Sequence, residues 1–131
     1  MRFEIYAMNT DLTVMVVEDE ELLLTAIAEK LKRESINAIL CKSGKEAIEY
    51  LGKNAQLPSV IWLDYYLKDM DGLAFMSVLK NETKWREIPV VVISNSASTE
   101  KVSTMLALGA KKYLLKAEYR LDDIIKIIRE L

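Results

Sequence analysis

Four apolar segments of this chain lead into residues that can do chemistry. Glu18 and Asp19 follow a Val-rich run, Asp64 ends VIWLD, Ser94 ends IPVVVIS, and Lys116 follows KKYLL. A carboxylate at the end of a buried strand is costly unless another group pairs with it. Carboxylate oxygens suit a hard cation such as Mg²⁺, and a lysine ammonium offsets negative charge. The residue types therefore predict a metal site lined by oxygen atoms, with a lysine beside it.

The elements that must position these residues alternate between two patterns. Near-continuous apolar runs predict strands that are covered on both faces, and apolar residues at i, i+3, i+4 and i+7 predict helices. The predicted strands span 12–18, 37–41, 59–64, 88–94 and 111–115, and the predicted helices run from about 20–33, 44–51, 72–81, 99–108 and 121–129. This alternation predicts an α/β fold, with a five-stranded parallel sheet flanked by five helices. The carboxyl ends of such strands share one rim, where ligands bind.

Local signals predict where several helices begin and end. Ser43 and Glu46 have the spacing of a capping box, and we expect Gly52 to end the helix that follows. Ser98 is a candidate cap for a later helix, and Gly109 stands where a left-handed C-terminal cap is expected.

Composition excludes several classes of function. The chain has 131 residues, 51% of them hydrophobic, and a net charge of −2, which favours one compact domain and disfavours direct DNA binding. It has no histidine, so imidazole zinc ligands and Ser-His-Asp catalysis are excluded. A single cysteine cannot form an internal disulfide, and no apolar run reaches the length of a membrane span. We expect a soluble cytoplasmic protein with no membrane contact.

The strand-end residues, taken together, resemble the active residues of response regulator receiver domains, the aspartate-phosphorylated modules of two-component signalling. The resemblance covers residues 12–131 and includes DYYLKDMDG from Asp64, IPVVVIS, and GAKKYLLKA. It implies a flavodoxin-like fold with strand order 2-1-3-4-5. It also implies that Asp64 accepts a phosphoryl group, assisted by Ser94 and Lys116. Its implied Mg²⁺ ligands are Glu18, Asp19, Asp64 and the backbone carbonyl of Tyr66.

The resemblance also implies how such a domain acts. Tyr113 would be the switch residue, coupling Ser94 to the surface formed by the helix ending near 108, the strand 111–115 and the terminal helix. The implied partner is a sensor histidine kinase or a histidine phosphotransfer protein, and an output domain or target protein would read the switched surface. The domain would promote its own phosphorylation without being a turnover enzyme. Candidate partner contacts on that surface are Lys101, Lys111, Lys112 and Tyr119.

Some residues depart from the usual family pattern. Ala117 replaces a proline after Lys116, so the cis peptide expected there loses its main physical cause. Lys68 also replaces a proline, and Asn95 stands where a smaller residue is usual. With Tyr66 and Ser96 nearby, the bulk of Asn95 predicts slow loss of phosphate.

Two questions stay open at this point. The alternative function is a phosphorylation-independent interaction module with the same fold, in which the altered loops have abolished switching. Residues 1–11 lie outside the resemblance, and we expect them to be an N-terminal extension or an added remnant.

Overall fold

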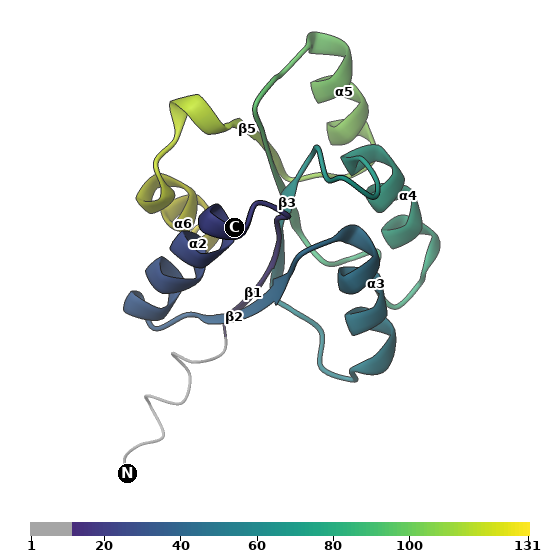
Figure 1. Ribbon diagram of the computed structural model, residues 1–131. Helices are drawn as coiled ribbons and strands as arrows, with labels where there is room; N and C mark the ends of the chain where they lie inside the picture. Colours follow the sequence, from purple (N-terminus) through teal and green to yellow (C-terminus); the bar gives the residue numbers. More distant parts are fainter. Residues whose placement is uncertain (1–11) are drawn as a thin grey trace.

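A five-stranded parallel sheet lies between two layers of helices in the computed structural model, which describes residues 12–131 (Figure 1). The strand order is β2-β1-β3-β4-β5, with every neighbouring pair parallel. The α/β class and the 2-1-3-4-5 order expected from the family resemblance are therefore confirmed. The strands are β1 (Thr13–Val17), β2 (Asn37–Cys41), β3 (Val60–Asp64), β4 (Val90–Ser94) and β5 (Lys112–Leu115).

The helices pack on the two faces of the sheet (Figure 1). Helices α2 and α6 cover one face, and α3, α4 and α5 cover the other. A short 3₁₀ helix, η1, follows β5 directly and was not predicted. The bounds are α2 (Glu21–Arg33), α3 (Gly44–Lys53), α4 (Gly72–Asn81), α5 (Thr99–Ala107), η1 (Lys116–Glu118) and α6 (Leu121–Arg129).

The central strands are the most deeply buried part of the molecule. Every residue of β3 and β4 is buried, as the apolar sequence of both strands requires for a sheet covered on two sides. Trp62 packs on the α2 and α6 side, and its neighbours Ile61 and Leu63 face the other helices. A close-packed interior resists displacement. Strand β3 is therefore a rigid support for the residue that ends it.

The start of α3 confirms half of the predicted capping box. The Ser43 hydroxyl accepts a hydrogen bond from the Glu46 N–H at 3.0 Å. The Glu46 carboxylate, however, accepts from the N–H of Lys42 at 2.7 Å rather than from Ser43. The side chain of Glu46 therefore bonds to the backbone one residue before the N-cap and not to the N-cap residue of a standard capping box.

The prediction that Gly52 ends α3 is wrong. The helix continues to Lys53, and Asn54 ends it, with its N–H and its side-chain amide both bonded to the Tyr50 carbonyl. An exposed glycine inside a helix costs only about 1 kcal/mol relative to alanine, which the last turn tolerates. The other helix signals are confirmed: Ser98 caps α5, and Gly109 has a positive φ of 108°.

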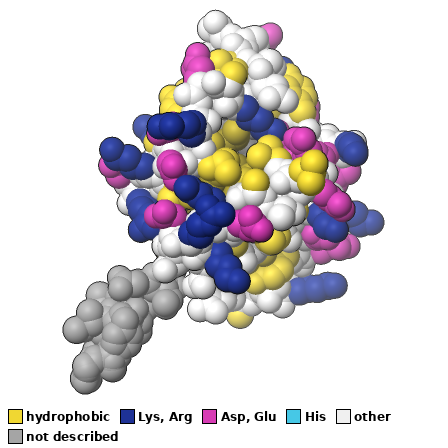
Figure 2. All heavy atoms as spheres, turned by 60° about the vertical axis from the view of Figure 1, so that its left-hand side comes forward, with side chains coloured by type: hydrophobic (Ala, Val, Ile, Leu, Met, Phe, Trp, Pro, Cys, Tyr) yellow, Lys and Arg dark blue, Asp and Glu magenta, His cyan; other side chains and the backbone are white. Residues whose placement is uncertain are grey.

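Charges of both signs mix on the α2 and α6 face, which comes forward in Figure 2. Lys30 of α2 pairs with Asp122 of α6 at 2.6 Å, and Arg129 of α6 pairs with Glu34, the residue that follows α2, at 3.2 Å. No uniformly basic surface appears in this view, in line with the composition. Within residues 12–131, no helix is long and apolar enough to cross a membrane.

Two expectations from the sequence concern the peptide bond after Lys116 and the segment 1–11. All described peptide bonds are trans, including the one between Lys116 and Ala117. The proposed extension at 1–11 lies outside the described residues, so the division at residue 12 stays a prediction.

Candidate functional site

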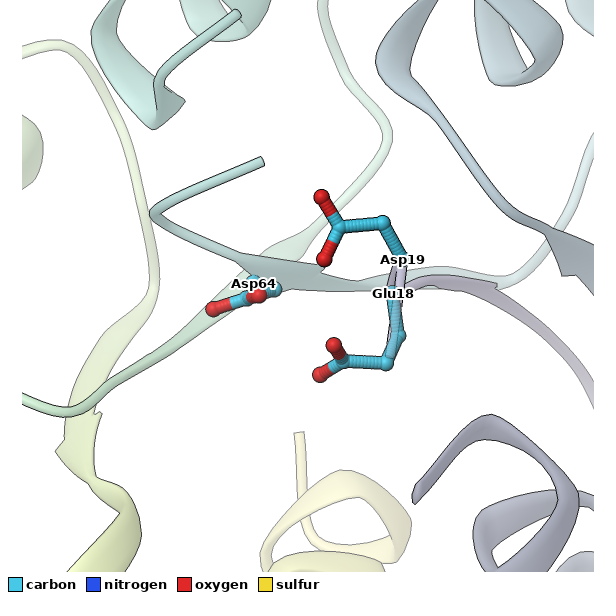
Figure 3. A group of neighbouring side chains, drawn as sticks. All are labelled: Glu18, Asp19 and Asp64. Carbon is cyan, nitrogen blue, oxygen red and sulfur yellow. The ribbon is translucent and has the colours of Figure 1, made fainter. Parts of the chain in front are cut away.

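Three carboxylates meet at the carboxyl ends of β1 and β3 (Figure 3). Glu18 and Asp19 follow β1, and Asp64 is the last residue of β3, which pairs directly with β1. One oxygen from each carboxylate lies within 4.8 Å of the others. Glu18 and Asp64 are only 1% and 5% exposed. The convergence predicted from the strand ends is therefore present.

Lys116 supplies the positive charge of this cluster. It follows β5, and its ammonium lies 3.2 Å from Glu18 Oε1 and 3.5 Å from Asp64 Oδ1. Its side chain is itself only 20% exposed. Buried charges are stable only when paired, so the lysine and the two acids depend on one another.

The electrostatics of the site indicate an excess of negative charge. Burial, followed by the charge of Glu18, raises the pKa of Asp64 to about 7, although Lys116 opposes the shift. Burial alone would lower the pKa of Lys116, but Asp64 and Glu18 outweigh it and the pKa is raised. One ammonium therefore does not neutralise the cluster, and a further cation would be favoured there.

Backbone groups hold two of the carboxylates in place. The N–H of Glu20 donates to Glu18 Oε2 at 3.0 Å, and the N–H of Lys68 donates to Asp19 Oδ2 at 2.7 Å. The second bond joins the end of β1 to the loop between β3 and α4. These acids are thus oriented before any ligand binds, as a cation site requires.

Ser94 ends the strand that lies between β3, which ends at Asp64, and β5, which Lys116 follows. It ends β4, which pairs with β3 on one side and with β5 on the other, and it is fully buried. Its hydroxyl oxygen accepts from the Ser96 N–H at 3.3 Å, which leaves its proton to donate. Within residues 12–131 it forms no hydrogen bond to Asp64.

Tyr113 lies in β5 beside the same loop. Its hydroxyl donates to the backbone carbonyl of Ser96 at 2.9 Å, and its ring centroid is 6.2 Å from that of Tyr65. The structure thus joins Tyr113 to the loop that follows Ser94. Its role as a switch stays a prediction.

Sequence reasoning missed a set of contacts around Tyr66. The Tyr66 hydroxyl lies 3.2 Å from Ser96 Oγ, and the Lys101 ammonium donates to the same hydroxyl. Lys101 was predicted only as a surface residue available to partners. Its reach from α5 to the loop after β3 follows no sequence periodicity, so no signal in the sequence indicated this contact.

Two acids in the loop after β3 cap different helices. Asp69 accepts hydrogen bonds from the N–H groups of Gly44 and Lys45, at 3.1 and 2.9 Å, and so caps α3 from a distant part of the chain. Asp71 caps α4 by accepting from Ala74 at 2.8 Å. Neither belongs to the carboxylate cluster, as expected from their place in the loop.

Comparison with known proteins identifies the family. The family model described as "Response regulator receiver domain" matches residues 14–129. This chain belongs to that family.

Among curated relatives of the receiver domain, the two-component response regulator ORR7 of Oryza sativa subsp. japonica is 32% identical over 114 residues. The match covers 87% of this chain but only 53% of ORR7, so this chain spans about half the length of that relative. The response regulator ARR17 of Arabidopsis thaliana is 26% identical, covering 92% of this chain and 85% of ARR17.

Solved structures agree with the assignment of a receiver domain. The receiver domain of Francisella response regulator 1452 superposes with a TM-score of 0.80 at 25% identity, covering 90% of this chain and 93% of that one. The phosphorylated cyanobacterial phytochrome response regulator RcpA gives a TM-score of 0.77 at 26% identity, covering 92% and 91%. A receiver protein from Pseudomonas putida, at 20% identity and a TM-score of 0.84 over 93% and 98% of the chains, supports the fold alone.

Proposed function

We propose that Asp64 of this receiver domain accepts a phosphoryl group from a histidine of a partner protein or from a small phosphodonor. The observation that carries the proposal is the buried carboxylate at the end of β3, paired with Lys116 and flanked by two further acids. Membership of the receiver family supports it, and the similar protein RcpA has been solved in a phosphorylated state. The family match favours this function over an interaction module that is never phosphorylated.

The transfer needs a nucleophile and groups that offset charge. A carboxylate oxygen of Asp64 attacks phosphorus, the new O–P bond forms, and the P–N bond of a phosphohistidine breaks. The imidazole leaves with the electron pair and takes up a proton. The Lys116 ammonium offsets the charge on the phosphoryl oxygens, and the Ser94 hydroxyl donates a hydrogen bond to one of them. The domain is changed by the reaction and does not turn over an external substrate.

The residues present fit a magnesium ion. Three carboxylates and one ammonium give the cluster a formal charge of about −2, which a divalent cation neutralises. Glu18, Asp19, Asp64 and the backbone carbonyl of Tyr66 would hold it. When bound, Mg²⁺ supplies charge neutralisation at the phosphoryl oxygens.

Signalling would follow from the loop that joins the site to the surface of α5, β5 and α6. Movement of Ser94 toward a phosphoryl oxygen would shift Ser96, whose carbonyl holds the Tyr113 hydroxyl. A sensor histidine kinase or a histidine phosphotransfer protein would donate the phosphoryl group in the cytoplasm. An output domain or a target protein would read the surface.

Intact mass measures the proposed transfer directly. We expect wild-type protein incubated with acetyl phosphate and Mg²⁺ to gain one phosphoryl group, and EDTA to suppress the gain. The control is Asp64→Ala, which lacks the acceptor. No gain by the wild type, or an equal gain by the variant, would contradict the proposal.

A further inference from the structure

Four side chains form a clasp between the loops that follow β3 and β4: Tyr66, Ser96, Lys101 and Tyr113. The Tyr66 hydroxyl contacts Ser96 Oγ, the Lys101 ammonium donates to that tyrosine hydroxyl, and the Tyr113 hydroxyl donates to the Ser96 carbonyl. Every bond of the clasp ends on Tyr66 or Ser96. The two loops are therefore tied together by side chains that take no direct part in phosphoryl transfer.

The clasp joins the two loops immediately after Asp64 and Ser94, the residues that end β3 and β4. Strands β3 and β4 are neighbours, and the N–H of Tyr65 still bonds to the Ile93 carbonyl at 3.0 Å. Tyr66 stands two positions after Asp64, and Ser96 stands two positions after Ser94. A bond between Tyr66 and Ser96 thus bridges the two loops next to the acceptor carboxylate.

Lys101 is held against this bridge. It lies in the first turn of α5, where its backbone N–H donates to the capping hydroxyl of Ser98 at 3.1 Å. Its ammonium also lies 5.1 Å from the ring centroid of Tyr65, which is buried. A cation near the N-terminus of a helix is disfavoured by the helix dipole. The contacts with the two tyrosines offset that cost and fix the direction of the lysine.

We infer that Lys101 is a positioning residue for phosphoryl chemistry at Asp64. It holds Tyr66 against Ser96, and the closed clasp narrows the approach between the two loops. Water that hydrolyses the phosphoryl group must reach phosphorus, after which the O–P bond to Asp64 breaks and inorganic phosphate leaves. A small phosphodonor must use the same opening. Lys101 therefore slows both the gain of phosphate from small donors and its loss to water. This inference rests on the proposed function.

A double-mutant cycle tests the inference. Intact mass follows gain and loss of phosphate in Lys101→Met, Tyr66→Phe and the double variant. We expect each single variant to speed both processes about three- to tenfold, the effect of one lost surface hydrogen bond on a rate. The double variant should match the singles because both changes open one clasp.

Two further variants serve as controls. Lys53→Met removes the same charge from the exposed last turn of α3, at the end of the sheet opposite the site, and should leave both rates unchanged. Lys101→Arg keeps a cationic donor that can bond the Tyr66 hydroxyl and lie over the tyrosine rings, and should keep both rates close to those of the wild type.

The outcomes separate the inference from the function on which it rests. Wild-type rates in Lys101→Met, or additive effects in the double variant, overturn the inference alone. Slower gain of phosphate together with weaker Mg²⁺ binding also overturns it, because the lysine would then act through the metal site. If the wild type never gains phosphate, the proposed function fails and the inference falls with it.

Discussion

At the scale of single residues, the site is a balance between burial and charge. Asp64 is almost inaccessible to water and faces Glu18, and both conditions favour its protonated form. Lys116 opposes them but also pairs with Glu18. A carboxylate that must attack phosphorus therefore lies in surroundings that hold it partly protonated until a further cation arrives.

The raised pKa of Asp64 predicts how stability depends on pH in the absence of metal. The folded pKa of about 7 exceeds that of an unfolded aspartate, so the stability that this group contributes is complete below about pH 4. That stability is lost as the pH rises toward the folded pKa. In EDTA, Asp64→Asn should therefore raise the free energy of unfolding by about 4 kcal/mol at about pH 8, and by less than about half of that at about pH 5.

Urea unfolding at the two pH values measures this difference. The exposed Asp122→Asn provides a control with the opposite shift, because the hydrogen bond from Lys30 lowers the pKa of Asp122 and outweighs the small opposing effect of burial. A gain for Asp64→Asn that is equal at both pH values would show that Asp64 does not titrate in this range.

Sequence alone located most of the acidic site but not its surroundings. Glu18, Asp64 and Lys116 were predictable because parallel strands bring their carboxyl ends to one rim, and each residue sits at such an end. The contact of Lys101 with Tyr66 was not predictable in the same way. It depends on the reach of two long side chains from different loops, which no residue spacing determines.

At the scale of elements, one acidic loop supports two helices. Asp69 accepts from two N–H groups at the start of α3, and this bond pair ties α3 to the loop after β3. Gly44 is packed tightly there, since an added Cβ would lie 2.5 Å from Met70 Sδ. The loop that follows Asp64 is therefore anchored on α3.

Removal of the Asp69 carboxylate should destabilise the fold. Asp69→Ala leaves two N–H groups of α3 without their acceptor and should lower the free energy of unfolding by about 1–2 kcal/mol. Glu49→Ala, which removes an exposed acid farther along the same helix, should change it by less than about 0.5 kcal/mol. Equal effects in urea unfolding would mean that the cap contributes nothing.

The helix boundaries show which local sequence signals predict the end of a helix correctly. Ser98 and Gly109 were predicted correctly because a capping hydroxyl and a positive φ are each needed at one position. Gly52 was predicted wrongly because glycine is permitted, not required, to end a helix. The 3₁₀ turn at Lys116–Glu118 arises from the connection between β5 and α6, which sequence periodicity does not describe.

At the scale of the whole molecule, helices cover both faces of the sheet, and the carboxylate cluster lies at the carboxyl ends of its strands (Figure 1). The burial of Cys41 depends on this packing. This residue ends the edge strand β2, is 1% exposed, and its carbonyl accepts from the Glu18 N–H at 3.0 Å. Burial, followed by the charge of Glu46, raises the pKa of its thiol to about 12.

The Cys41 thiol should therefore be inert in the folded protein. We expect iodoacetamide to label it only through unfolding, so the labelling rate should rise about fivefold for each kcal/mol of destabilisation when Asp69→Ala is compared with the wild type. Intact mass measures the rate. Fast labelling that is equal in both proteins would show that β2 opens locally, without unfolding of the domain.

The position of the phosphoryl group in the chain decides whether Asp64 is the acceptor. After incubation with acetyl phosphate and Mg²⁺, borohydride reduces an aspartyl phosphate to homoserine, and trypsin then separates residues 54–68 from residues 69–80. The first peptide contains a single acidic residue, Asp64, and the second contains Asp69 and Asp71. Phosphorylation of Asp64 predicts homoserine at position 64 alone. Homoserine at position 69 or 71, or unmodified Asp64 in protein that carries phosphate, would contradict it.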